Sequence, residues 1–202
     1  MFRWFALVVF VMTLSISATR RWQARLAGGA IRRGEESGGL ILGRVAVALP
    51  LFGGVLAYLA NPPWMAWASV NLPLWTQWTG VVLGVLAAPS VDWVLTCLGT
   101  NVSETVLTKQ EHRLVTVGPY RWMRHPLYTV GIALFVGIGL MAANWFILLW
   151  AGIALVAVRL VVIPREEDHL EAAFGEEYRR YRSVTGSLLP SLRGIRDRRR
   201  AG

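Results

Sequence analysis

Polar residues that could hold a ligand stand at the start of one apolar run and at the end of the next. The stretch "GPYRWMRHPLYTVG" (118–131) places Arg124 and His125 directly before an apolar segment, and Glu166 and Glu167 directly follow the apolar segment after it. Guanidinium and imidazolium groups donate to carboxylates, whereas carboxylates accept from ammonium groups. These four residues therefore suit a zwitterionic ligand, provided that the fold brings them together.

Each half of this set also has a purely structural interpretation. Arg121 and Arg124 are typical of the basic residues that orient a membrane protein. His125 precedes Pro126, which suits the first turn of a helix, so the histidine could simply be a cap. The acidic residues after Pro164 complement the dipole at a helix N-terminus. The residue types alone leave the ligand site and these structural roles open.

The composition indicates a membrane protein. Of the 202 residues, 54% are hydrophobic and only 16% are charged, whereas a soluble domain has about a quarter charged residues. The net charge of +9 comes from arginine clusters that flank apolar blocks, a pattern that indicates membrane orientation rather than nucleic-acid binding. A single cysteine excludes an internal disulfide, and no zinc-ligand spacing occurs, so no metal is expected.

Five apolar segments predict an all-α membrane protein with about five transmembrane helices, because a span needs about 20 mostly apolar residues. We expect the first to be a retained anchor rather than a cleaved signal peptide, since no small-residue cleavage site precedes Arg20. Pro50 predicts a kink in the second, and Pro89 and Asp92 interrupt the third. Only "AAN" separates the last two, which predicts a helical hairpin. The segments are roughly 2–18, 40–60, 74–98, 127–141 and 145–163.

The hairpin places the start of its first helix beside the end of its second. Arg124 and His125 should therefore face Glu166 and Glu167 across one small pocket. Converging charge at a membrane boundary is costly unless paired, and it marks a candidate site by default. We divide the chain into N-terminal helices (1–98), a cofactor-binding core (99–190) and a basic disordered tail (191–202).

Basic and uncharged loops alternate along the chain. Loops 19–39 and 99–126 and the tail after 163 carry most of the arginines and the single lysine, whereas loops 61–73 and 141–145 carry no charge. The positive-inside rule then places the N-terminus outside and the C-terminus in the cytoplasm. This orientation puts the predicted site at the cytoplasmic face of what we expect to be the plasma (inner) membrane.

Three further features concern charges and the C-terminal segment. Leu170, Phe174, Tyr178 and Tyr181 recur at helical spacing, which predicts a cytoplasmic amphipathic helix over 164–183 that lies on the membrane or packs on the core. Arg159, inside the fifth segment, must either bind an anion or extend to the cytoplasmic surface. Asp92 must either pair with a neighbouring helix or mark a substrate cavity.

The motifs of the C-terminal half resemble those of the isoprenylcysteine carboxyl methyltransferase family and of the related phospholipid N-methyltransferases. Three elements occur in order between about 99 and 190. They are H-x-L-V-T-x-G-x-Y from His112, R-H-P-x-Y from Arg124, and E-E-x-x-L-x-x-x-F-G-x-x-Y-x-x-Y from Glu166. The combination and its spacing are more specific than any one element.

The resemblance implies an S-adenosylmethionine-dependent methyltransferase whose cofactor pocket is closed off by the C-terminal segment. We expect Arg124, Glu167 and Arg159 to be the catalytic residues. The residues implied to bind the cofactor are His112, Arg113, Leu114, Val115, Tyr120, His125, Pro126, Leu127, Tyr128 and Glu166.

The methyl acceptor stays open at this stage. The expected substrate is a lipid or lipid-modified small molecule from the bilayer, such as an isoprenylcysteine-like carboxylate. However, Val162 stands where the eukaryotic prenylcysteine enzymes have an arginine four residues before the glutamate. The alternatives are a phospholipid amine N-methyltransferase, an NADPH-dependent sterol-type reductase and a non-enzymatic membrane protein.

Overall fold

The computed structural model describes residues 1–28, 38–99 and 114–191. Within these ranges β structure is limited to two isolated bridges, so the predicted all-α class is confirmed for the described part of the chain. The helices are α1 (Phe2–Gly28), α2 (Gly38–Ala60), α3 (Leu74–Leu98), α4 (Pro126–Ala142), α5 (Trp145–Ala157) and α6 (Ile163–Val184). Shorter helical segments are η2 (Pro62–Ala68) and η4 (Gly118–Arg121), both 3-10 helices, and η5 (Val158–Val162), a π-helix.

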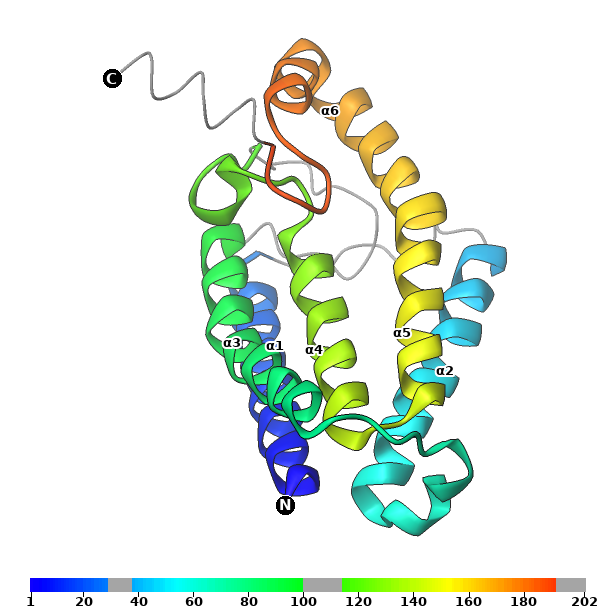
Figure 1. Cartoon of the computed structure of the whole chain (residues 1–202). Helices are drawn as coiled ribbons and strands as arrows, with labels where there is room; N and C mark the ends of the chain where they lie inside the picture. Colours follow the sequence, from blue (N-terminus) through cyan, green and yellow to red (C-terminus); the bar gives the residue numbers. More distant parts are fainter. Residues whose placement is uncertain (29–37, 100–113, 192–202) are drawn as a thin grey trace.

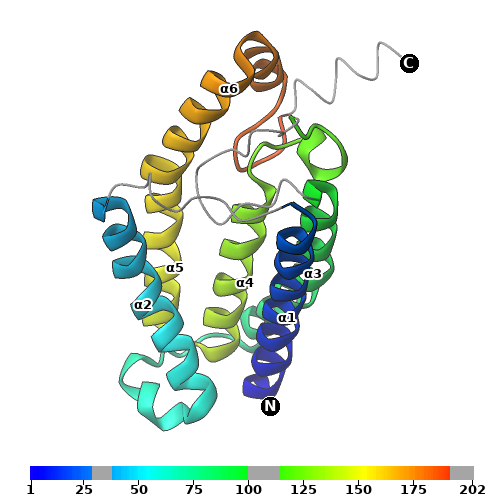
Figure 2. The same cartoon turned by 180° about the vertical axis from the view of Figure 1, so that it is seen from behind.

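Helices α1 to α5 form a bundle in which consecutive helices run in opposite directions (Figures 1 and 2). The N-terminus, η2 and the turn between α4 and α5 lie at one end. The segment that leads into α4 lies at the other end, together with α6. The uncharged connections thus share one end of the bundle, as their alternation with basic loops predicts.

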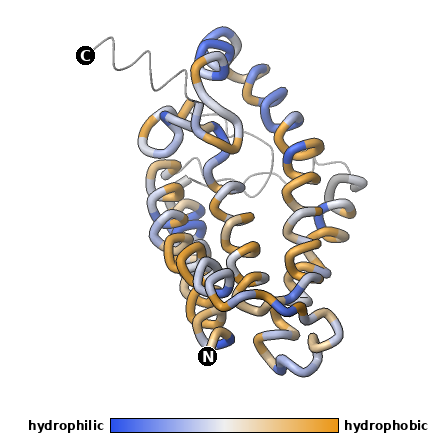
Figure 3. Tube along the Cα trace, in the orientation of Figure 1, coloured by the Kyte–Doolittle hydropathy of each residue, from blue (hydrophilic) through white to orange (hydrophobic). Residues whose placement is uncertain are grey.

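Four helices are long and apolar enough to cross a membrane by length and composition: Phe2–Leu26, Leu42–Ala60, Leu74–Leu98 and Trp145–Val184. Helix α4 is also apolar but has only 17 residues. Four of the five predicted spans are therefore confirmed as candidates, and α4 is a shorter apolar helix. Figure 3 shows the apolar residues along the bundle and the hydrophilic residues gathered on α6 beyond its end.

The first and third predicted segments need correction. Helix α1 continues ten residues beyond Ala18, to Gly28, and α3 is not interrupted at Pro89 and Asp92. Both helices carry a charge at these places, and the two charges are paired: Arg20 donates to the two oxygens of Asp92 at 2.7 and 3.1 Å. This ion pair joins α1 to α3, so Asp92 pairs with a neighbouring helix, the first of its two predicted roles. A paired charge is far less costly at a membrane boundary than an isolated one.

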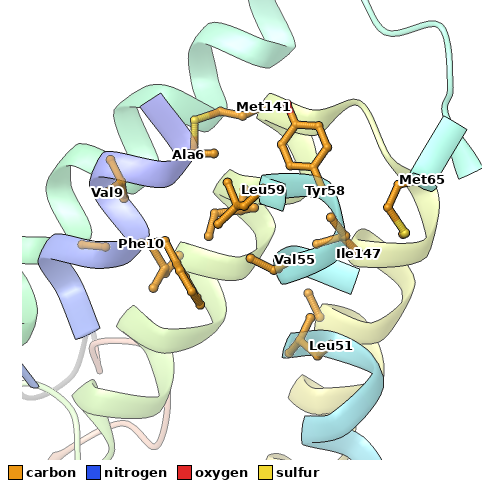
Figure 4. Close-up of a cluster of buried hydrophobic side chains, with 14 of the residues drawn as sticks. Ala6, Val9, Phe10, Leu51, Val55, Tyr58, Leu59, Met65, Met141 and Ile147 are labelled. Atoms are coloured by element: carbon orange, nitrogen blue, oxygen red, sulfur yellow. The ribbon is translucent and has the colours of Figure 1, made fainter. Parts of the chain in front are cut away.

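The apolar core joins all five helices of the bundle. Figure 4 shows Ala6, Val9 and Phe10 of α1 packing near Leu51 and Val55 of α2, with further buried residues from α4 and α5. The N-terminal helix therefore supplies part of the core in addition to its predicted role as an anchor.

Helices α3 and α4 approach each other closely at glycines. A Cβ atom at Gly80 would lie 2.5 Å from the carbonyl oxygen of Gly137, and one at Gly137 would lie 2.9 Å from that of Gly80. Small residues allow helix backbones to pack this closely where no hydrophobic effect drives association. The second half of α4 is thereby held against the first half of α3.

The predicted hairpin of α4 and α5 is confirmed and has a defined turn. Ala143 adopts a left-handed conformation (φ 47°), which ends α4. Asn144 then caps α5: its side-chain oxygen accepts from Ile147 N at 3.2 Å, and its amide donates to Met65 O at 3.1 Å. The second bond connects the hairpin to η2.

Helix α6 is not the single amphipathic helix that its spacing predicts. Gly175 has non-helical angles (φ 53°, ψ −122°), and the helix turns back on itself there. Arg182 Nε lies 3.4 Å from Glu167 Oε2, although residues fifteen apart in a straight helix would be about 22 Å apart. The fold-back returns the end of α6, with the buried rings of Tyr178 and Tyr181, to its own beginning.

Candidate functional site

The site lies where the N-terminus of α4 meets the first turn of α6. Gly118 begins η4 in a left-handed conformation (φ 57°), and a Cβ atom there would overlap the sulfur of Cys97 on α3. Glycine thus allows this turn to pack on α3. Pro126 then opens α4, where its missing N–H leaves no donor unsatisfied. His125 is the N-cap residue and faces α6.

The structure brings together the four residues with which the sequence analysis began. Arg124 Nε donates to Glu167 Oε1 at 2.8 Å, and His125 Nε2 lies 3.2 Å from the same oxygen. His125 Nδ1 lies 3.5 Å from Glu166 Oε2. The side chains of Arg124, His125 and Glu167 are 10%, 4% and 8% exposed, respectively. The predicted juxtaposition is therefore a buried ionic cluster.

The two glutamates differ in their partners. Glu167 contacts Arg124, His125 and Arg182, so its charge is fully engaged. Glu166 Oε2 is buried, and its ion-pair contact with His125 Nδ1, at 3.5 Å, is too long to count as a hydrogen bond, so no hydrogen bond to this oxygen is made among the described residues. Buried polar atoms are nearly always hydrogen-bonded in native proteins. Glu166 is thus the member of the cluster that has acceptor capacity for a ligand.

Two neighbouring hydroxyl groups share this property. Tyr178 OH and Ser187 Oγ are buried, and neither has a hydrogen-bond partner within the described ranges. Both come from the returning half of α6 and the segment after it.

Opposing effects act on the pKa of His125. Burial disfavours the charged imidazolium, but hydrogen bonds and the charges of Glu166 and Glu167 favour it more strongly, so the pKa is raised from the ordinary value of 6.5. The buried ring is therefore protonated more readily than a free imidazole. Burial, followed by the nearby Glu166 charge, raises the pKa of Tyr120, which keeps this phenol neutral.

The segment after α6 pairs with the segment before α4. Arg124 N and His125 N donate to Gly186 O and Ser187 O at 2.9 and 3.1 Å, and Gly186 N donates to Trp122 O at 3.2 Å. The Arg124 guanidinium also donates to the carbonyl oxygens of Arg182 and Thr185. These bonds place residues 185–191 directly over the entrance to α4.

The remaining predicted cofactor residues surround this cluster to different degrees. Tyr120 is buried, and its carbonyl oxygen accepts from Tyr181 OH at 2.7 Å. The Tyr128 ring lies 6.0 Å from that of His125. Leu114 and Val115 are half-buried in the segment before η4. Pro126 is buried and Leu127 packs on a small core cluster of α1 and α3, whereas His112 and Arg113 lie outside the described residues.

Arg159 is not gathered into the cluster. It is exposed on η5 and forms no hydrogen bond or ion pair with the described part of the chain. Conversely, Arg182, Tyr178 and Ser187 lie next to the site, although the sequence did not predict them there. Their signal was Gly175 in the middle of an otherwise helical pattern, because a glycine there allows the fold-back that returns them to α4.

Comparisons with known proteins agree with this architecture. The phospholipid methyltransferase family profile matches residues 75–177. The chain is 27% identical over 134 residues to a human protein named Protein-S-isoprenylcysteine O-methyltransferase, a match that covers 64% of this chain and 46% of the human one. It is also 27% identical over 152 residues to the Arabidopsis thaliana Protein-S-isoprenylcysteine O-methyltransferase B, covering 71% and 73% of the two chains.

A solved structure shares the fold. It is a eukaryotic intramembrane Ras methyltransferase, an isoprenylcysteine carboxyl methyltransferase, with a TM-score of 0.55 and 21% identity. The similarity covers 93% of this chain and 63% of that one, and the match to the human relative spans about half of that protein's length. The family match extends over about half of this chain and includes Arg124, His125, Glu166 and Glu167. The chain therefore belongs to the phospholipid methyltransferase family of membrane methyltransferases, which its relatives identify with the isoprenylcysteine carboxyl methyltransferases.

Proposed function

We propose that this protein transfers a methyl group from S-adenosylmethionine to a lipophilic acceptor that resides in the bilayer. The observation that carries the proposal is the buried cluster at the entrance to α4, in which Glu166 Oε2 has no hydrogen-bond donor among the described residues closer than His125 Nδ1 at 3.5 Å. The ammonium group of the cofactor would supply the missing donor. The residues of the cluster therefore suit the amino-acid end of this cofactor.

The carboxylate of the cofactor would lie on the opposite side of the cluster. His125, in its protonated form, and the N-terminus of α4 would stabilise it, because free N–H groups and the positive end of the helix dipole favour an anion. Leu114 and Val115, with His112 and Arg113, would border the adenine through backbone groups, as the family resemblance implies. Tyr120, Pro126, Leu127 and Tyr128 would form the walls of the pocket, and residues 185–191 would close it.

Arg124 and Glu167, which we expected to be catalytic, are better assigned as positioning residues. Their polar atoms are engaged with each other, with His125 and with the carbonyl oxygens of Arg182 and Thr185. They would orient the imidazole and fix the segment after α6, without touching the reacting atoms. The exposed position of Arg159 favours its extension to the membrane surface.

Methyl transfer requires the protein mainly to position the two reactants. S-adenosylmethionine, when bound, supplies a methyl group that is already activated as a sulfonium. The residues of this chain would align the acceptor for in-line displacement and exclude water, which favours a reaction that neutralises charge. A carboxylate acceptor needs no general base, whereas an amine acceptor must be neutral, as an apolar site favours.

The orientation follows from the basic loops. We propose that the N-terminus is outside and that the site faces the cytoplasm of a plasma (inner) membrane, since the described parts of the basic segments, with Arg20, Arg124 and Arg182, lie at the α6 end of the bundle. The cofactor would then enter from the cytosol, and the acceptor would enter from the bilayer.

A labelled-methyl assay tests the proposal. The purified protein in lipid nanodiscs should transfer labelled methyl from S-adenosylmethionine to a component of a lipid extract, detected as a mass shift. A titration with NADPH separates the reductase alternative. Labelled lipid without NADPH binding supports methyl transfer; NADPH binding without labelled product contradicts it.

A further inference from the structure

An arginine on α2 is turned toward the interior of the bundle. Arg44 precedes Val47, Leu51 and Val55 at intervals of three and four residues, and all three pack in the apolar core. Residues at this spacing share one face of a helix. Leu49, on the other side of α2, is exposed. Arg44 therefore heads the core-facing stripe of a candidate membrane span, where a cation is rare and marks a functional site by default.

A second arginine approaches from α1. The pair between Arg20 and Asp92 fixes the rotation of α1 against α3. One turn later Ala24 is buried in a small cluster against which Leu127, in the first turn of α4, also packs. Arg21 lies on this part of α1 and is itself half-buried. Its position places a second cation near the first turn of α4.

Tyr128 connects both arginines to the candidate cofactor site. Arg21 and Arg44 each interact electrostatically with its hydroxyl group, and so does Glu166. The Tyr128 ring also adjoins that of His125. Charges from two separate helices therefore act on Tyr128, which adjoins the residues that would hold the methyl donor.

We propose that Arg21 and Arg44 bind the anionic oxygen group of the lipid acceptor, a carboxylate or a phosphate, beside Tyr128. This inference rests on the proposed function. Guanidinium groups match both oxyanions with paired N–H donors, and a site shielded from water strengthens the attraction. Both arginines lie outside residues 75–177, the part that the family profile matches. They are therefore specificity-determining residues contributed by the N-terminal helices.

The test compares charged and neutral ligands on the full-length protein in nanodiscs. Arg21→Met and Arg44→Met keep the apolar stem and remove the charge, and Arg44→Lys restores the charge without the paired donors. Arg180→Ala, an exposed arginine of α6, is the control. The probes are N-acetyl-S-farnesylcysteine, its neutral methylamide, and dihexanoylphosphatidylethanolamine; S-adenosylmethionine is titrated in parallel.

We expect each Met variant to bind at least one of the two oxyanion-bearing probes, N-acetyl-S-farnesylcysteine or the zwitterionic phospholipid, at least about tenfold more weakly, with unchanged affinity for the methylamide and for S-adenosylmethionine. Arg44→Lys should recover part of the loss, and Arg180→Ala should match the wild type. A loss confined to the farnesylcysteine probe identifies a carboxylate; a loss confined to the phospholipid identifies a phosphate.

Three results overturn the inference. The first is that the wild-type protein binds neither oxyanion-bearing probe more tightly than the methylamide. The second is that the Met variants keep the wild-type preference for an oxyanion-bearing probe. The third is that the Met variants lose as much affinity for S-adenosylmethionine as for that probe. The third result would assign the arginines to cofactor binding instead. Wild-type protein that fails to bind S-adenosylmethionine at all refutes the proposed function, so the two failures are distinguishable.

Discussion

Replacing Glu167 by glutamine tests whether this carboxylate holds the site together. Its carboxylate contacts Arg124 Nε at 2.8 Å, His125 Nε2 at 3.2 Å and Arg182 Nε at 3.4 Å. A hydrogen bond that involves a charged group contributes about 1.5–3 kcal/mol. The contacts with Arg124 and His125 are buried, whereas the Arg182 side chain is 49% exposed and adds little.

The two buried contacts together set the expected cost. They would contribute about 3–6 kcal/mol, and the glutamine oxygen still accepts one bond, so Glu167→Gln should lower the free energy of unfolding by about 3 kcal/mol. This value lies at the lower end of the roughly 3–5 kcal/mol expected when one partner of a buried ion pair is lost. The assay is reversible unfolding by sodium dodecyl sulfate in mixed micelles.

Glu171→Gln provides a matched control. Glu171 also contacts Arg182, at 3.4 Å, but it lies nearer the surface of α6 and its side chain is 33% exposed. We expect it to cost less than about 1 kcal/mol, as exposed ion pairs do. Equal effects of the two substitutions, or a Glu167→Gln variant as stable as the wild type, would refute the assignment of Glu167 as the hub of a buried cluster.

Three further predictions concern separate contacts. Tyr181→Phe removes the bond to Tyr120 O and should cost about 1 kcal/mol in the same unfolding assay; an unchanged midpoint contradicts it. Gly80→Val should prevent folding or lower the melting temperature by many degrees, because its Cβ would meet Gly137 O, and a variant that melts like the wild type contradicts the close approach. The stability contributed by the raised pKa of His125 is present in full below pH 6.5 and is lost as pH rises through the folded-state pKa; this slope should vanish in His125→Gln, and its persistence there assigns it to another group.

Local periodicity and segment length predicted the helices well. The bounds of α3, Leu74–Leu98, match the predicted apolar segment, and the short connection 142–144 between the last two predicted segments predicted the hairpin of α4 and α5. The hairpin in turn predicted that His125 would face Glu166. These features follow from contacts between neighbours in the chain, or from a turn too short to allow another arrangement.

The errors come from contacts between residues distant in sequence. In the sequence Arg20 indicates the end of a span, because its partner Asp92 lies 72 residues later in the chain. The apolar spacing of α6 predicts a straight helix, whereas the contacts of Arg182 with Glu167 become favourable only when the chain turns at Gly175. The spacing of apolar residues does not predict such pairs, because each charged residue, taken alone, is compatible with exposure to solvent.

The central claim is that the buried cluster holds the amino-acid end of S-adenosylmethionine. Calorimetric titration of the wild type and of Glu166→Ala and His125→Ala, each shown to be folded by its melting transition, measures this directly. We predict binding by the wild type and at least about tenfold weaker binding by both variants, since each loses a charged contact. Folded variants that bind S-adenosylmethionine as tightly as the wild type would contradict the claim.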